Sequence, residues 1–301
     1  MTGIMKQLKP GRDPEDRHPF FEQLDQLLRN RTAVGGLIIT IIFLICALFA
    51  PALSPHNPVD ASLYDQLKPP VWDETGTWQH IFGTDDLGRD ILSRIIYGAR
   101  VSLTVAVVSV GIAFLLGSVM GCIAGFYKGL CDNLIMRGMD LILAFPSILL
   151  AIVTVAYLGP SLRNAMIAIG IIYVPRFARI VRASVLEESE KDYVAAARAI
   201  GTGDFRIVFG EIFPNCLGPL IVQTTLSFAS AILDAAALSF LGLGAQPPTP
   251  EWGAMIAMGR SHIFRAWWVM TIPGLAILLA VLGFNLFGDG LRDVLDPRLR
   301  D

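Results

Sequence analysis

The residues best suited to catalysis or metal binding are few and scattered along the chain. Four histidines and four cysteines occur, namely His18, His56, His80 and His262, and Cys46, Cys122, Cys131 and Cys216. No histidine stands at ligand or catalytic spacing from a cysteine or carboxylate within an apolar segment, and no CxxC pair exists. The sequence also lacks a G-x-x-x-x-G-K-[ST] phosphate loop. We therefore expect no catalytic site, metal, disulfide or bound cofactor in this chain.

Two carboxylates lie well inside apolar stretches, where an ionised group is costly and commonly functional. Asp140 follows Arg137 by three residues, and this spacing predicts a local structural ion pair. Asp234 stands in the small-residue run "SFASAILDAAALSF" with no charged residue three or four positions away. It is our candidate for a translocation path or gate. Close packing of helices through these small residues is the alternative, which stays open.

The composition indicates that lipid is the main solvent of the protein. Of the 301 residues, 53% are hydrophobic and 17% are charged. A membrane span needs about 20 mostly apolar residues. Five charge-free runs are long enough, covering residues 32–59, 101–127, 141–162, 212–233 and 266–288. The first run is preceded by a mostly polar segment of 31 residues and exceeds the length of a signal-peptide core, so we interpret it as a retained span.

A sixth span is predicted over about residues 162–183, although Arg176, Arg179 and Arg182 lie along its end. Arginine side chains can extend to the interface from such a position. With six spans and an inside N-terminus, 17 Lys and Arg residues lie inside and seven outside, in agreement with the positive-inside rule. Removing this span would move six of the 17 outside. We therefore expect both termini in the cytoplasm.

This topology divides the chain into five parts. They are a cytoplasmic tail (1–31) that includes an amphipathic helix, a first transmembrane helix (32–53), a periplasmic segment (54–100), a five-helix core (101–290) and a cytoplasmic tail (291–301). A second amphipathic helix, capped by Thr84 and lying on the outer surface, is predicted within residues 83–100. Trp252, Trp267 and Trp268 are interpreted as interfacial anchors.

A charged, helix-prone segment, "AAARAIGTGDFRIVFGEIFPN" at residues 195–215, lies between two apolar runs in the loop 184–211. Residues 192–200 favour a helix, Gly201 can end it in the left-handed conformation, and Thr202 can cap the next helix. A helix of about nine residues is marginal in water, so something must pack on it. The alanines at 195, 196, 197 and 199 suit close approach by a partner protein. Packing against the protein's own helix ends explains them equally well.

The stretches "DYVAAARAIG" and "EIFPN" together resemble the cytoplasmic coupling motif of the permeases of ATP-binding cassette importers. Ala196, Ala197, Gly201 and Pro214 match that motif, whereas Ala195 replaces its glutamate. Three further stretches, "GTDDLGRDILSRIIYGARVSL", "LSFLGLGAQPPTPEWGAM" and "FNLFGDGLRDVLDPRLRD", are similar to the C-type permease subunits of dipeptide and oligopeptide importers. An acidic residue at the place of Asp234 also fits the family.

The resemblance implies an all-α integral membrane protein of the type I importer permease fold in the bacterial inner membrane. It implies a second homologous permease, two cytosolic ATPases that bind ATP and Mg²⁺, and a periplasmic peptide-binding protein, but no nucleic acid. Arg89, Arg94 and Trp252 become candidates for docking the binding protein. The implied cargo is dipeptides or short oligopeptides. Relatives carry glutathione, nickel chelates, opines or antimicrobial peptides, and an ion-driven transporter or channel is the least favoured alternative.

Overall fold

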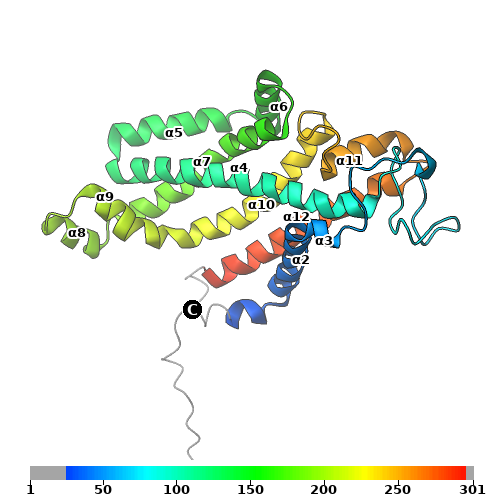
Figure 1. Ribbon diagram of the computed structural model, residues 1–301. Coiled ribbons are helices and arrows are strands. Elements are labelled where there is room, and N and C mark those ends of the chain that lie inside the picture. Colours follow the sequence, from blue (N-terminus) through cyan, green and yellow to red (C-terminus); the bar gives the residue numbers. More distant parts are fainter. Residues whose placement is uncertain (1–24, 296–301) are drawn as a thin grey trace, which may run out of the picture.

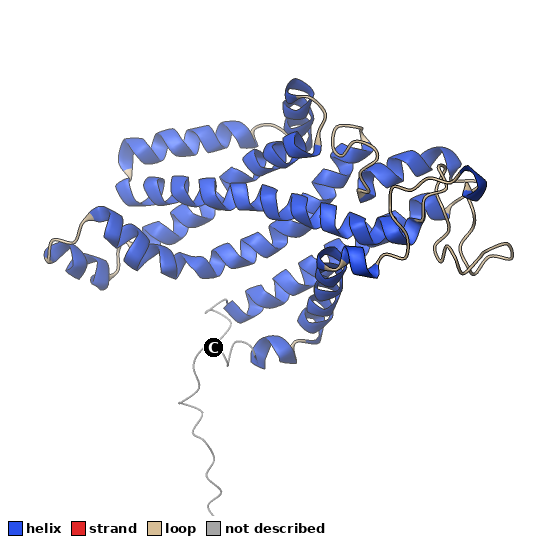
Figure 2. Ribbon diagram, in the orientation of Figure 1, coloured by secondary structure: helices blue, strands red, loops and turns tan. Residues whose placement is uncertain are grey.

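The computed structural model describes residues 25–295 of the chain, and this part is helical apart from loops and one isolated bridge between Thr84 and Asp90 (Figure 2). The main helices are α2 (Arg31–Leu48), α4 (Ile91–Tyr127), α5 (Gly129–Leu143), α6 (Ser147–Leu158), α7 (Leu162–Glu188), α10 (Leu217–Phe240) and α12 (Trp268–Leu295). Short helices are α3 (Ala50–Leu53), α8 (Asp192–Ala199), α9 (Asp204–Arg206) and α11 (Trp252–Gly259). The predicted N-terminal amphipathic helix falls mostly outside the described residues.

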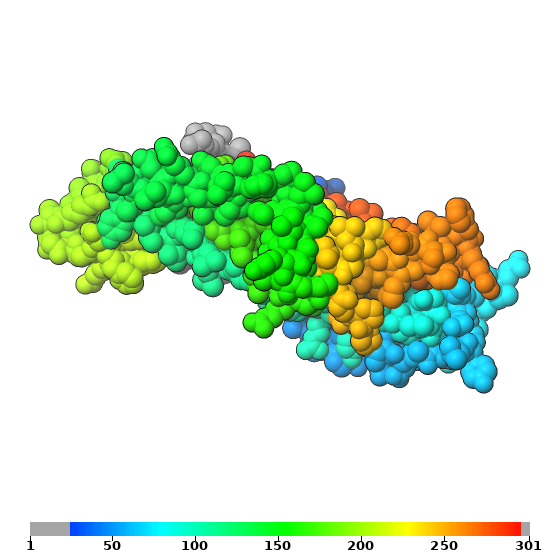
Figure 3. All heavy atoms as spheres, turned by 90° about the horizontal axis from the view of Figure 1, so that it is seen from above, coloured from blue at the N-terminus to red at the C-terminus, as the bar shows by residue number. Residues whose placement is uncertain are grey.

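The long helices form an elongated bundle in which α4, α7 and α10 run side by side (Figure 1). Helix α12 packs on α10 and α2, and α5 lies beside α4 and α7. The loop that carries α8 and α9 lies at one end, and the 54–90 segment and α11 lie at the other, as the view from above also shows (Figure 3). The loop that carries α8 and α9 is thus separated from the 54–90 segment and α11 by the length of the bundle.

The contact between α4 and α7 depends on glycines. Gly117, Gly121 and Gly125 recur every four residues and face α7. A Cβ atom built on Gly121 would lie 2.6 Å from the carbonyl oxygen of Ala178 and 2.7 Å from Cβ of Val181. Small residues at this spacing allow two helix backbones to approach closely. The two helices therefore form the tightly packed centre of the bundle.

Five helices are long and apolar enough to span a membrane in the described part of the chain, or six if α5 and α6 are counted as one broken span. The sixth span predicted from the charge count is α7. The span predicted over 141–162 is not one continuous helix, because α5 and α6 meet at an 89° bend. Pro146 explains the bend, since proline disfavours helical geometry at the preceding residue and cannot donate a backbone hydrogen bond.

The second amphipathic helix is also corrected. Helix α4 begins at Ile91 rather than Thr84 and continues unbroken to Tyr127. The side chain of Asp90 caps it by accepting a hydrogen bond of 2.8 Å from the amide of Ser93. Thr84 instead lies in the preceding loop, where its hydroxyl accepts from the amide of Lys68. Ile91 and Ile96 are buried in the protein, so this stretch does not lie on the membrane surface.

Candidate functional site

The helix predicted within the loop 184–211 is confirmed as α8. It ends at Ala199, and Gly201, two residues further on, adopts a φ of +79°. The amide of Thr202 donates to the carbonyl of Ala197, and the amide of Gly201 donates to that of Arg198, each at 3.0 Å. This pair of bonds is the Schellman arrangement, which glycine favours at the left-handed position. Thr202 therefore takes part in ending α8. The residue that caps the next helix, α9, is Gly203 and not the predicted Thr202.

Polar contacts fix α8 to the ends of the long helices. The hydroxyl of Tyr193 donates to Glu188 at 2.7 Å, and Lys191 donates to the same carboxylate at 2.6 Å. Burial and the hydrogen bond to Glu188 raise the pKa of Tyr193 to about 12. Beside them Lys128, directly after α4, pairs with Glu190 at 2.6 Å, and this hydrogen bond lowers the pKa of Glu190. The loop is held to α4 and α7 by these contacts.

The loop also exposes small and apolar residues among its charged ones. Ala195, Ala196, Gly201 and Pro214 are exposed, whereas Ala197 is half-buried and packs against the core. The exposed surface continues over Ile200 and Phe205, whose side chains are 83% and 77% exposed. Sequence reasoning did not single out these two residues, although large apolar side chains in a charged loop were a usable signal. We call Ala195, Ala196, Ile200, Gly201, Phe205 and Pro214 the coupling surface.

Asp234 is not the isolated charge that the sequence indicated. Its carboxylate accepts a hydrogen bond of 2.7 Å from the hydroxyl of Tyr173 in α7. The guanidinium of Arg176 lies 5.0 Å from the centre of the same tyrosine ring. Spacing within one helix could not show these neighbours, because they come from another helix. The three residues form a polar centre between α7 and α10.

The ion pair between Arg137 and Asp140 is a wrong prediction. Asp140 instead pairs with Arg179 of α7 at 2.6 Å. One turn further along α7, Arg182 contacts both carboxylate oxygens of Asp132, at 2.5 and 2.6 Å. Helix α5 lies directly beside α7. The carboxylates of α5 therefore pair with the arginines of α7 and not with Arg137 of their own helix. The arginines thus connect two helices and do not simply mark the end of one.

The three candidates for docking a binding protein are all buried. Arg89 and Arg94 lie beside Asp85, at 2.7 and 3.6 Å respectively, and their side chains are almost fully enclosed. Trp252 is fully buried, and its indole nitrogen donates to the carbonyl of Ile95 at 3.1 Å. These side chains cannot meet a partner on the surface. They hold the 54–90 segment and α11 onto α4.

Burial also corrects the predicted tryptophan anchors. Besides Trp252, Trp268 is buried and donates from its indole nitrogen to the carbonyl of Thr84 at 3.2 Å, and only Trp267 keeps a partly exposed ring. Beside Trp252, the buried Glu251 caps α11 by accepting from the amides of Gly253 and Ala254. Desolvation raises the pKa of Glu251 above its ordinary value. These side chains form a buried layer rather than an interfacial belt.

Comparison with known proteins places this geometry in a family. Residues 117–301 match the family described as the inner membrane component of binding-protein-dependent transport systems. Residues 19–70 match the N-terminal transmembrane domain of oligopeptide transport permease C. Among solved structures, the MetNI methionine ABC transporter in its inward-facing conformation superposes with a TM-score of 0.55 at 18% identity, covering 67% of this chain and 96% of that one. This likeness shows the fold, a type I importer permease.

Curated relatives match over almost the whole length. The di/tripeptide transport system permease protein DppC of Pseudomonas aeruginosa is 51% identical, with 97% of each chain covered. The dipeptide transport system permease protein DppC of Escherichia coli K12 is 52% identical, with 95% of this chain and 96% of that one covered. The helical architecture with five or six apolar spans, the multi-pass inner-membrane character and the exposed loop that carries α8 and α9 agree with these matches. The chain therefore belongs to the inner membrane components of binding-protein-dependent transport systems, as a permease subunit of an ABC importer.

Proposed function

We propose that the permease moves dipeptides or short oligopeptides across the inner membrane. This choice of cargo rests on the relatives named for dipeptide and di/tripeptide transport, which match almost the whole chain at 51% and 52% identity. The chain itself is the non-catalytic subunit. ATP and Mg²⁺ are bound, and ATP is hydrolysed, by two cytosolic ATPases, and a periplasmic binding protein delivers the peptide.

The coupling surface is the site where an ATPase docks. Its small residues permit close backbone approach, and the apolar side chains of Ile200 and Phe205 are the kind of groups that fill a pocket in a partner. The polar contacts of Tyr193 and Lys128 connect this surface to α7 and α4. Movement of the ATPase is thereby passed to the long helices. The loop faces the cytoplasm in this arrangement, as do both termini.

A second, homologous permease completes the path. Helices α5 and α6 expose a row of large apolar side chains, including Leu130, Leu134, Leu141, Val153 and Tyr157. Lipid and a second permease together cover this surface. Asp234, Tyr173 and Arg176 are the polar groups of α7 and α10 that we assign to the translocation path or its gate.

Uptake measurements test the proposed cargo. Vesicles that contain the permease with its partner permease, ATPases and binding protein should accumulate a labelled dipeptide only when ATP is supplied. Unlabelled dipeptide should compete, whereas glutathione, an opine or a nickel chelate should compete poorly. Accumulation of one of these compounds in place of the dipeptide would overturn the cargo, and accumulation without ATP would overturn the importer.

Asp234→Asn should reduce uptake about 10-fold or raise basal ATP hydrolysis without substrate. Asparagine has nearly the same volume and can still accept the hydrogen bond from Tyr173, so the substitution removes mainly the charge near Arg176. A hydrogen bond to a charged group contributes about 1.5 to 3 kcal/mol and a neutral one about 0.5 to 1.5 kcal/mol. The difference is similar to the value of about 1.4 kcal/mol that corresponds to a 10-fold change. Tyr173→Phe, which keeps the charge, is the matched control. Normal uptake by Asp234→Asn together with failed assembly of Asp234→Leu would reduce Asp234 to a packing element.

A further inference from the structure

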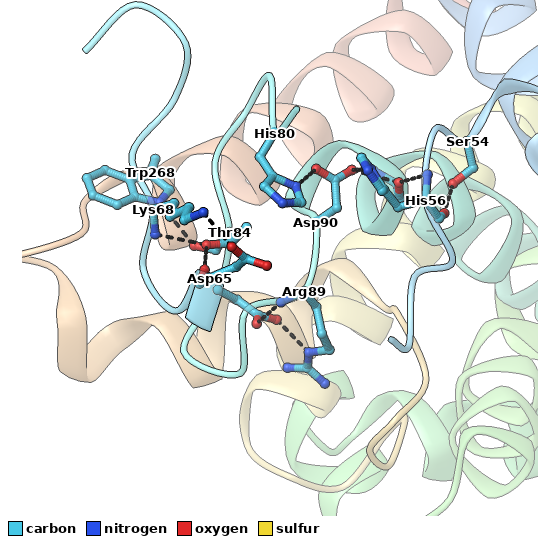
Figure 4. A network of polar contacts seen from close by, with 11 residues as sticks. Ser54, His56, Asp65, Lys68, His80, Thr84, Arg89, Asp90 and Trp268 are labelled. Carbon is cyan, nitrogen blue, oxygen red and sulfur yellow. Dashed lines mark hydrogen bonds and ion pairs between the residues drawn. The ribbon is translucent and has the colours of Figure 1, made fainter. Parts of the chain in front are cut away.

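Two histidines and an aspartate meet in the loop that precedes α4 (Figure 4). His56 lies just after α3, His80 lies in the middle of the 54–90 segment, and Asp90 caps α4. One potential ligand atom from each residue lies within 4.8 Å of the others. The chain separates the three residues widely, so spacing along the sequence gave no sign of this cluster.

The distances fit a shared cation. Nδ1 of His80 lies 2.9 Å from Oδ1 of Asp90, and Nδ1 of His56 lies 3.8 Å from Oδ2 of the same carboxylate. Two ligands of a tetrahedral zinc ion, each about 2.1 Å from the metal, lie about 3.4 Å apart. Both observed separations are within about 0.5 Å of that value. Small side-chain rotations would therefore bring the three groups into coordination.

The cluster contains a potential ligand atom that forms no hydrogen bond. Nδ1 of His56, which lies 3.8 Å from Asp90, is buried and has no hydrogen-bond partner within residues 25–295. His80 and Asp90 have side chains that are only 6% and 1% exposed. A buried polar atom without a partner carries a free-energy cost that a ligand can remove. The side chain of His56 is 35% exposed and gives the cluster access to solvent.

Neighbouring groups already hold the ligands in place. The hydroxyl of Ser93 donates to Oδ2 of Asp90 at 2.6 Å and accepts from the backbone amide of His56 at 3.1 Å. The amide of Ser93 also donates to Oδ2 of Asp90 at 2.8 Å. Such supporting hydrogen bonds orient carboxylate and histidine ligands in metal sites. Oδ1 of Asp90 remains the oxygen that faces His80.

We propose that His56, His80 and Asp90 bind a divalent transition-metal cation of the zinc type, with water in the fourth position. Imidazole nitrogen and carboxylate oxygen are ligands that Zn²⁺ accepts in tetrahedral sites. The cation joins the end of the first span, the middle of the 54–90 segment and the start of α4. It fixes this loop structure and is separate from the proposed path through Asp234.

Metal binding by the assembled transporter tests the proposal, with a purification tag that contains no histidine. After dialysis against buffered Zn²⁺, the wild type should hold one more zinc ion per permease chain than His80→Gln. His56→Gln and Asp90→Asn should each weaken Zn²⁺ binding at least about 10-fold, because loss of a supporting residue alone has an effect of that size. Asparagine can still cap α4, so Asp90→Asn spares the helix.

Cobalt provides a second measurement. Co²⁺ in place of zinc should give the visible absorption of a tetrahedral site in the wild type and not in His56→Gln, whose substitution lies on a partly exposed loop. His262→Gln removes a histidine outside the cluster and should behave as the wild type. Equal zinc content in the wild type and the three cluster variants, or equal loss in His262→Gln, would overturn the proposal and leave a hydrogen-bonded pair.

Discussion

Gly121→Leu is expected to prevent α4 from packing against α7 and to leave little assembled permease in the membrane. A Cβ atom at this position would lie 2.6 Å from a backbone oxygen and 2.7 Å from the Cβ of Val181, and neither atom can move without its helix. Overpacking of a tight core costs about 1 to 3 kcal/mol when neighbouring side chains can adjust. Two helix backbones cannot adjust in this way, so we expect Gly121→Leu to lower the stability by about 3 kcal/mol or more.

Gly111 offers a matched control on the same helix. A Cβ atom built there meets nothing within 4 Å, so Gly111→Leu adds the same volume without a clash. Yield, thermal stability in detergent and assembly with the partner subunits would be compared for both variants. If the two variants assembled equally well, the close contact of α4 and α7 would not be needed for the fold.

Ala196→Arg should reduce coupled transport at least about 10-fold while the permease still inserts and folds. Ala196 is exposed on α8, so the larger side chain causes no clash within the chain. In the docked complex it would occupy space that the proposed contact leaves to an ATPase, and it would bury a charge without a partner, which is costly. Substrate-stimulated ATP hydrolysis and copurification of the ATPase measure the effect.

Ala196→Ser is the size control for this variant, because it keeps the side chain small and should transport normally. Ala197 gives a weaker test of docking. It is half-buried against the protein's own core, so a large residue there would disturb α8 itself. Wild-type coupling by Ala196→Arg would mean that the ATPase docks elsewhere.

Features that depend on one segment were predictable from the sequence. The helix of the loop 184–211 and its end before Gly201 follow from local propensity and from the left-handed conformation that glycine accepts. The charge-free apolar runs predicted five spans, and the count of Lys and Arg residues on each side of the membrane predicted the sixth. Five of the six predicted spans correspond to long apolar helices, because each is determined mainly by its own residues and the surrounding solvent, whereas the run 141–162 is broken by a bend.

Features that depend on two segments were missed. The partners of Asp234 and Asp140, namely Tyr173 and Arg179, lie on α7 and cannot be found from spacing along α10 or α5. The same reason explains why Arg94 was expected on the surface although it is buried. The 89° bend at Pro146 was missed for another reason, since the charge-free run 141–162 is long and apolar enough for one continuous span.

The unbroken length of α4 has a mechanical consequence. At about 1.5 Å per residue, its 37 residues make a rod of about 55 Å, which is longer than the hydrocarbon core of about 30 Å. One end begins at Asp90, and the other is followed directly by Lys128, which is tied to Glu190 beside α8. A tilt of about 10° would shift one end relative to the other by about 10 Å. A displacement of the loop is thus transmitted along α4 to its far end without bending of the helix.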